Sequence, residues 1–189
     1  MRRLFLIAGL MTAFGLAIVA ASAFAPANFA GTWSLDKTKS QGLSQRMQNA
    51  ESVIWTITQD GKTISIDSKV TAGQPSAGGT GGGGGGGMGG GRGGGPTGPQ
   101  VYNLDGNEST SDVTFGQNTG KAATKATWLN SGATLELSRK TTFQGQNGEV
   151  TNSNDQKLSL SGDGKVLTVA QHSDGPRGAQ DSTLVFNKQ

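Results

Sequence analysis

The stretch that decides the fold is Phe29-Ala30-Gly31-Thr32-Trp33-Ser34-Leu35, which follows almost directly on an apolar leader. A Gly-x-Trp segment at such a place is typical of the opening strand of a small antiparallel barrel. The leader in front of it is typical of a protein that leaves the cytoplasm. Together they predict an exported β-domain.

The first 23 residues have the three parts of a secretory signal peptide. Arg2 and Arg3 form a positive start, residues 4–21 are apolar or small apart from Thr12, and Ala21-Ser22-Ala23 fits the small-x-small cleavage rule. We therefore expect cleavage after Ala23, a mature chain of residues 24–189, and a periplasmic or extracellular location. The alternative is a retained anchor, because the apolar run is long enough to span a bilayer. Once the leader is removed, we expect no stable membrane span.

The composition of the mature chain argues against several classes of partner. Without Arg2 and Arg3, 14 basic side chains stand against 13 acidic ones, and no block of Lys and Arg stands out. A nucleic-acid partner is not expected, because it needs a basic footprint to neutralise phosphates. The chain has no Cys, so the folded domain must be stable without disulfides.

A glycine-rich insert interrupts the domain. Residues 78–95 include 15 glycines among 18 positions. Such a run buries too little apolar area to offset its conformational entropy, so residues 72–98 are predicted to form one disordered loop. A barrel tolerates a long loop because closure entropy grows slowly with loop length. We therefore expect a single β-domain over residues 24–189.

Short alternating segments separated by turn dipeptides fill the rest of the chain. Residues 52–59 place Val53, Trp55 and Ile57 on one face, and residues 133–142 place Leu135 and Leu137 inward. Asp60-Gly61 after the first of these predicts a two-residue type I′ hairpin turn. The other predicted strands are residues 31–36, 62–70, 101–104, one around 113–115, 121–129, 157–161, 165–171 and 181–187, with a helical turn or two at 44–50.

The fold class predicted from this spacing is all-β. A single antiparallel meander of about 8–10 strands would expose costly edges if left open, so closure into a lipocalin-like, calycin-like barrel is expected. The same alternation also permits a two-sheet β-sandwich.

Four motifs, in order, resemble an uncharacterised family of exported bacterial proteins with a lipocalin-like domain. The first is Phe29-Ala30-Gly31-Thr32-Trp33-Ser34-Leu35-Asp36 followed by Lys39-Ser40, and the second is Leu104-Asp105-Gly106. The third is Leu160-Ser161-Gly162-Asp163-Gly164-Lys165-Val166-Leu167-Thr168-Val169, and the fourth is the ending Leu184-Val185-Phe186-Asn187-Lys188. Gly31-x-Trp33 also resembles lipocalins and fatty-acid-binding proteins. In those proteins the Trp closes one barrel end and a cation near the last strand packs over it. The resemblance implies that role for Trp33 and Lys188.

The sequence contains few of the side chains that commonly act in catalysis. It has one His, His172, and no Cys, so multi-His zinc sites and Cys nucleophiles are excluded. His172-Ser173-Asp174 has the residue types of a triad, but side by side, where a triad needs convergence in space. We predict no catalytic residue, no metal and no cofactor.

The aromatic side chains suggest where a ligand could bind. Trp55, Tyr102, Phe115 and Trp128 either fill the core or partly line a cavity, and Ala-rich strand 121–129 would leave room for one. The first function predicted is a non-enzymatic binding module for a small apolar ligand. The alternative is a structural or protein-interaction barrel of the cell envelope with a solid core and an unknown protein partner.

Overall fold

The computed structural model describes residues 25–73, 98–115, 118–145, 148–176 and 178–189. The predicted signal peptide, residues 1–23, lies outside the described residues. Residues 74–97 of the predicted glycine-rich loop also lie outside them. No helix in the described part of the chain is long and apolar enough to cross a membrane.

Ten strands, one short α-helix and one 3₁₀ turn make up the described chain. In chain order they are β1 (Gly31–Leu35), α1 (Gln45–Asn49), β2 (Ala50–Gln59), β3 (Thr63–Ala72), β4 (Gln100–Asn103), β5 (Ser109–Phe115), β6 (Asn118–Leu129), η1 (Asn130–Gly132), β7 (Thr134–Gly145), β8 (Gly148–Leu160), β9 (Val166–Asp174) and β10 (Gln180–Lys188). Most match the strands predicted from alternation. The largest difference is β8, which begins nine residues before the predicted strand at Lys157.

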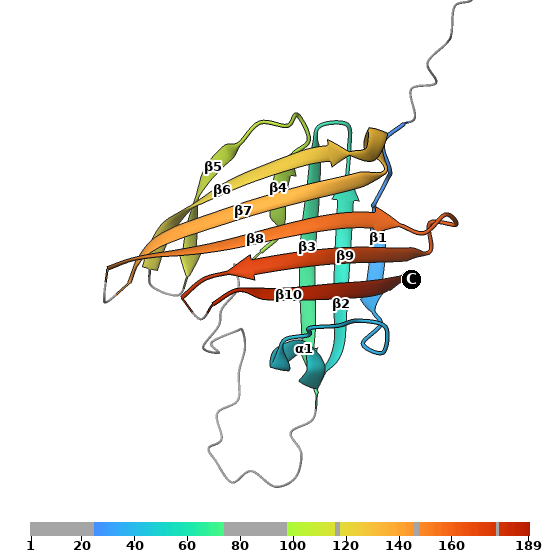
Figure 1. The fold of residues 1–189 in the computed structure, drawn as a ribbon, viewed down its shortest axis with the longest axis horizontal. Coiled ribbons are helices and arrows are strands. Elements are labelled where there is room, and N and C mark those ends of the chain that lie inside the picture. Colours follow the sequence, from blue (N-terminus) through green and yellow to red (C-terminus); the bar gives the residue numbers. More distant parts are fainter. Residues whose placement is uncertain (1–24, 74–97, 116–117, 146–147, 177) are drawn as a thin grey trace, which may run out of the picture.

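All ten strands form one antiparallel sheet in the order β4-β3-β2-β1-β10-β9-β8-β7-β6-β5. β1 joins the two halves, because it pairs with β2 on one side and with the last strand, β10, on the other. The sheet folds over so that β6–β10 cross in front of β1–β3 (Figure 1). The predicted all-β barrel is therefore confirmed as a nearly closed barrel of ten strands. The alternative of a two-sheet sandwich is wrong, because all ten strands belong to one continuous sheet.

The barrel is open between β4 and β5, which lie at the two ends of the sheet order. Asp105 and Asn107 hold the connection between them. The Asp105 carboxylate accepts hydrogen bonds from the backbone and side-chain nitrogens of Asn107, which keep the pKa of Asp105 below its usual range. Gly106 has φ +79°, a conformation that glycine adopts without steric cost. This short connection keeps two free strand edges facing one opening.

The Asp60-Gly61 turn differs from the predicted type I′ turn. That type needs positive φ at both central residues, and neither Asp60 nor Gly61 has one. Instead the Asp60 carboxylate accepts from the backbone amides of Lys62 and Thr63 at 2.7 and 2.6 Å, and these bonds lower its pKa. The side chain of Asp60 thus closes a longer loop that the dipeptide signal does not distinguish from a tight one.

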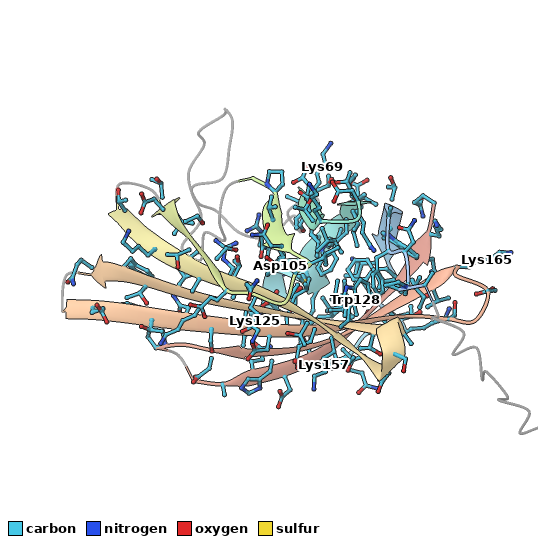
Figure 2. All side chains as sticks on the ribbon, turned by 90° about the horizontal axis from the view of Figure 1, so that it is seen from above. Lys69, Asp105, Lys125, Trp128, Lys157 and Lys165 are labelled. Atoms are coloured by element: carbon cyan, nitrogen blue, oxygen red, sulfur yellow. The ribbon has the colours of Figure 1, made fainter. Side chains whose placement is uncertain are left out.

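The hydrophobic core lies between the two layers. Its members alternate along the strands, so each strand contributes the side chains of its inner face. Side chains are crowded between the layers near Trp128 (Figure 2). Leu135 and Leu137 are fully buried, as predicted from the alternation of β7. The largest fully buried side chains are Trp33, Tyr102, Phe29 and Phe186.

Candidate functional site

The inner face of the half-barrel β5–β10 changes from apolar at one end to polar at the other. Strand register aligns one apolar row, formed by Leu184, Val169, Leu158, Leu135 and Trp128. The next aligned row consists of Gln171, Gln156, Leu137 and Ala126. The row after that consists of Ser173, Asn154, Arg139, Thr124 and Ser109. The interior therefore has a solid apolar half and a half lined by hydrogen-bonding groups.

Trp33 lies at the apolar end and is fully buried. Its indole Nε1 donates to the carbonyl of Phe29 at 2.9 Å, and the Nζ of Lys188 lies 5.2 Å from its ring centroid. Phe29 precedes β1, and its ring stacks on Trp128 with centroids 6.1 Å apart. The Gln59 side chain accepts from the Phe29 amide at 2.9 Å. The structure thus brings the predicted pair Trp33 and Lys188 together, within a larger cluster that covers this barrel end.

The four side chains predicted to line a ligand cavity are placed differently from one another. Trp55 and Tyr102 are almost fully buried in the core, and the Trp55 ring centroid lies 4.6 Å from that of Phe186. Trp128 is partly buried against the core. Phe115 ends β5, and its side chain lies outside the described part of the structure. Trp55, Tyr102 and Trp128 are not among the residues that line the cavity at the β4–β5 opening, and the contact of the four residues with a ligand stays a prediction.

Trp55 has one feature that a solid core does not explain. Its indole N–H is buried and has no hydrogen-bond partner within the described residues. Burying an unpaired donor costs on the order of 1–3 kcal/mol. An acceptor that reached this donor would remove that cost.

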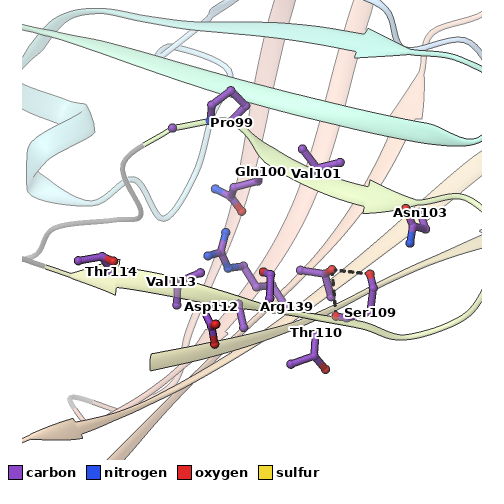
Figure 3. A pocket seen from close by; sticks show the side chains of 14 residues that line it. Pro99, Gln100, Val101, Asn103, Ser109, Thr110, Asp112, Val113, Thr114 and Arg139 are labelled. Atoms are coloured by element: carbon purple, nitrogen blue, oxygen red, sulfur yellow. Dashed lines mark hydrogen bonds between the residues drawn. The ribbon is translucent and has the colours of Figure 1, made fainter. Parts of the chain in front are cut away.

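A cavity of about 530 Å³ lies at the opening between β4 and β5. The free edges of both strands border it, and β6 and β7 form its floor (Figure 3). Its lining mixes hydroxyl, amide, aliphatic and charged groups, contributed by Gly98, Pro99, Gln100, Val101, Asn103, Ser109, Thr110, Ser111, Asp112, Val113, Thr114, Ala122, Thr124 and Arg139. At its wall Ser109 and Thr124 share a hydroxyl–hydroxyl hydrogen bond of 3.2 Å. The opening therefore gives a small molecule access to the polar half of the interior.

Arg139 is the cation of this cavity. It lies on the inner face of β7, in register with Asn154 on β8 and Thr124 on β6. Figure 3 shows its guanidinium between Gln100 and β5. Its side chain makes no hydrogen bond and no ion pair to any residue that the structure describes. The five guanidinium donors of Arg139 are therefore not bonded to any described residue of the cavity.

Tyr102 is close enough to Arg139 for the two groups to interact electrostatically. Burial raises the pKa of Tyr102 to about 12. The positive charge of Arg139 opposes this shift, because it favours the ionised form of the hydroxyl. The neutral hydroxyl donates to the Oε1 of Gln100 at 3.2 Å. Tyr102 is therefore a buried, neutral group near Arg139 that does not line the cavity, and it does not neutralise the guanidinium.

Amide and hydroxyl side chains also lie on the inner face of β8 and β9, in register with Arg139 or one row further along, but outside the residues that line the cavity. Asn154 donates to the hydroxyl of Ser173 at 2.7 Å, and Gln171 donates to the same hydroxyl at 3.0 Å. Gln156 is buried and lies 3.4 Å from the Oε1 of Gln171. These four residues form what we call the polar ladder. The hydrogen bonds within the ladder join β8 to β9 on the inner face of the sheet.

A second, shallower hollow lies on the outer face of β7–β10. Glu136, Asp155, His172 and Asp181 are found there with Lys157. The Nδ1 of His172 and the Oδ1 of Asp181 are 2.6 Å apart, and this hydrogen bond raises the pKa of His172. Both side chains are well exposed, so the pair is weak in water. Among the described residues, no group of three or more His, Cys, Asp and Glu side chains is placed to hold a metal ion.

No family model and no curated protein matches this chain. Among solved structures, the ileal bile acid-binding protein of zebrafish, in complex with cholic acid, is similar to it. The likeness covers 85% of this chain and 98% of the other, with 13% identity and a TM-score of 0.45. At this identity and TM-score the likeness tells nothing about a ligand of the present chain. The family resemblance drawn from the four motifs stays a prediction.

The sequence reasoning did not single out Arg139. The signal was present, because Leu135, Leu137 and Arg139 share one face of an alternating strand. A charged residue on the inner face of a predicted strand is unusual and indicates a site. The polar ladder had no comparable signal, because amides and hydroxyls on a strand are read as its solvent face.

Proposed function

We propose that this protein is an exported, non-enzymatic binding module that holds a small molecule in the cavity at the β4–β5 opening. The observation that carries the proposal is the cavity itself. Its volume of about 530 Å³ lies within the range common for small-molecule sites, and a few polar groups converge on it. A barrel with a solid apolar end and an accessible polar half suits binding, because the apolar end stabilises the fold without the ligand.

The lining favours a ligand with polar groups over a wholly apolar one. Ser109, Thr124 and Arg139 would be desolvated by an apolar ligand without any replacement for their hydrogen bonds to water. Val101, Val113 and Ala122 supply apolar surface beside them. The ligand we propose is therefore small and of mixed character, in place of the purely apolar ligand predicted from the sequence.

The alternative, a structural or interaction barrel with a solid core, fits only one half of the interior. The apolar end is closed by Trp33, Phe29 and Lys188, as that alternative requires. The cavity at the opposite side of the core has no role in it. We keep protein interaction as the function that remains if the cavity binds nothing.

Export is proposed on the strength of the leader alone. Protein purified from its own host is expected to begin at Phe24, because Ala21-Ser22-Ala23 fits the cleavage rule. Intact-mass and N-terminal analysis measures this directly. A mature protein that still carries Arg2 and Arg3 would refute the export proposal and would leave the binding proposal untouched.

Single-cysteine variants test whether the cavity takes a ligand. The chain has no Cys, so Ser111→Cys places one thiol at the cavity, and Lys125→Cys places a matched thiol on the outer face of β6. The rate of thiol modification is measured with and without decanoate, D-glucose, D-glucuronate or an anilinonaphthalene sulfonate dye. We expect at least one of these compounds to slow modification of Ser111→Cys several-fold in a saturable way. The proposal would be contradicted if no compound slowed modification of Ser111→Cys more than it slowed modification of Lys125→Cys.

A further inference from the structure

The guanidinium of Arg139 has no anionic partner on its own face of the barrel. Strand alternation places Glu136, Asp155, Asp174 and Asp181 on the outer face of β7–β10, opposite to Arg139. Among the residues that line the cavity, Asp112 carries a carboxylate. Its carboxylate is 3.0 Å from the Nζ of Lys121, so it already has a cationic partner. A partly buried cation without a counter-charge favours binding of an anion from solution.

The chemistry of Arg139 selects among anions. A guanidinium presents a planar fork of donors that matches the two oxygens of a carboxylate. The neighbouring hydroxyls of Ser109 and Thr124 add a donor and acceptors at the same wall. Tyr102 carries no charge that would repel the anion, because burial raises its pKa to about 12.

Amide and hydroxyl groups of the cavity wall select the rest of the ligand. Gln100, Asn103, Ser109 and Thr124 line the cavity beside Arg139. An aliphatic tail that covered these groups would leave their donors and acceptors unpaired, which weakens binding. Hydroxyl groups on the ligand would instead satisfy them.

We infer that the cavity binds a compact, hydroxylated carboxylate, with the carboxylate on Arg139 and the hydroxyls on the amide and hydroxyl groups that line the cavity. This inference rests on the proposed function and names its class of ligand. Sugar acids have this combination of groups. Long-chain fatty acids share the carboxylate but lack the hydroxyls, and neutral sugars share the hydroxyls but lack the charge.

Three six-carbon probes separate these features. D-Glucuronate carries both the carboxylate and the hydroxyls, D-glucose carries the hydroxyls alone, and hexanoate carries the carboxylate alone. Binding of each to the full protein is measured by ¹H–¹⁵N correlation spectra, which detect weak association, and includes the side-chain Nε signal of Arg139. We expect D-glucuronate to bind at least about tenfold more tightly than either of the other probes, a difference of about 1.4 kcal/mol.

Variants of Arg139 complete the experiment. Arg139→Gln is expected to weaken D-glucuronate binding by at least about tenfold. Arg139→Lys is expected to be intermediate, since it keeps the charge and loses the fork. Lys125→Gln removes one positive charge from the outer face of the neighbouring strand and should leave the affinity unchanged. Thermal unfolding of each variant verifies that the fold is retained.

The outcomes distinguish the inference from the proposed function. If hexanoate or D-glucose binds as tightly as D-glucuronate, or if Arg139→Gln binds D-glucuronate as well as the wild type does, the inference is wrong and small-molecule binding stands. If none of the three probes shifts any signal of the cavity, the inference is wrong, and the proposed function is wrong as well only if no compound protects Ser111→Cys from modification.

Discussion

Replacement of Trp33 by alanine is expected to lower the free energy of unfolding by about 3–5 kcal/mol, the usual cost of deleting a buried large aromatic. Trp33 is fully buried, with none of its surface accessible to solvent. The substitution would also leave the carbonyl of Phe29 without the donor that now lies 2.9 Å away. Chemical denaturation followed by circular dichroism measures the change.

Lys188→Ala is the matched control for this prediction. Its Nζ lies 5.2 Å from the Trp33 ring centroid near the protein surface, so its loss should cost on the order of 1 kcal/mol or less. A change of only a few tenths of a kcal/mol on Trp33→Ala would mean that the barrel end does not depend on this ring. The role inferred from the Gly-x-Trp resemblance would then be wrong.

Phe29→Ala is expected to destabilise the protein by about 3–5 kcal/mol, although Phe29 belongs to no strand. Its ring is fully buried and stacks on Trp128, and its backbone is bonded to Gln59 and Trp33. The substitution removes the ring that covers the apolar end, and the cavity it leaves adds to the lost burial. The free energy of unfolding in urea measures the effect.

Val101→Ala serves as the comparison for Phe29→Ala. Val101 is an apolar strand residue, but 52% of its surface is exposed, so its truncation should change stability by about 0.5 kcal/mol or less. Similar effects from the two substitutions would show that residues before β1 contribute no more than a surface side chain, and that the end cluster does not stabilise the barrel.

Hydrophobic alternation predicted the strands whose inner faces are apolar. In β2 and β7, apolar residues recur at every second position, as at Trp55 and Ile57 or Leu135 and Leu137, because those positions face the core. The number of strands and closure into a barrel followed from the same pattern. The prediction worked where packing selects apolar residues.

The same pattern failed over the first part of β8. Residues 149–156 were not predicted as a strand, because their inner positions include Asn152, Asn154 and Gln156 instead of aliphatic residues. Those positions line the polar half of the barrel. Alternation between two polar faces cannot be detected in a sequence, so the failure of the strand prediction and the failure to find the polar ladder have one physical cause.

The type I′ turn at Asp60 failed for a different reason. An Asp-Gly pair suits a tight turn, but the Asp60 carboxylate can also accept from two successive backbone amides and close a longer loop. Sequence alone does not decide between these arrangements, because the choice depends on the register of β2 and β3. That register is set by the burial of Ile57 and Ile66 across the sheet.

The central claim is that a small molecule binds inside the barrel at the β4–β5 opening. The most direct measurement is a ¹H–¹⁵N chemical-shift map of the protein titrated with D-glucuronate, hexanoate and D-glucose. We expect saturable chemical-shift changes at residues 100–103, at residues 109–114 and at Arg139, with little change around Trp33. Shifts confined to the outer hollow at His172 and Asp181, or no saturable shift with any of the three compounds, would contradict it.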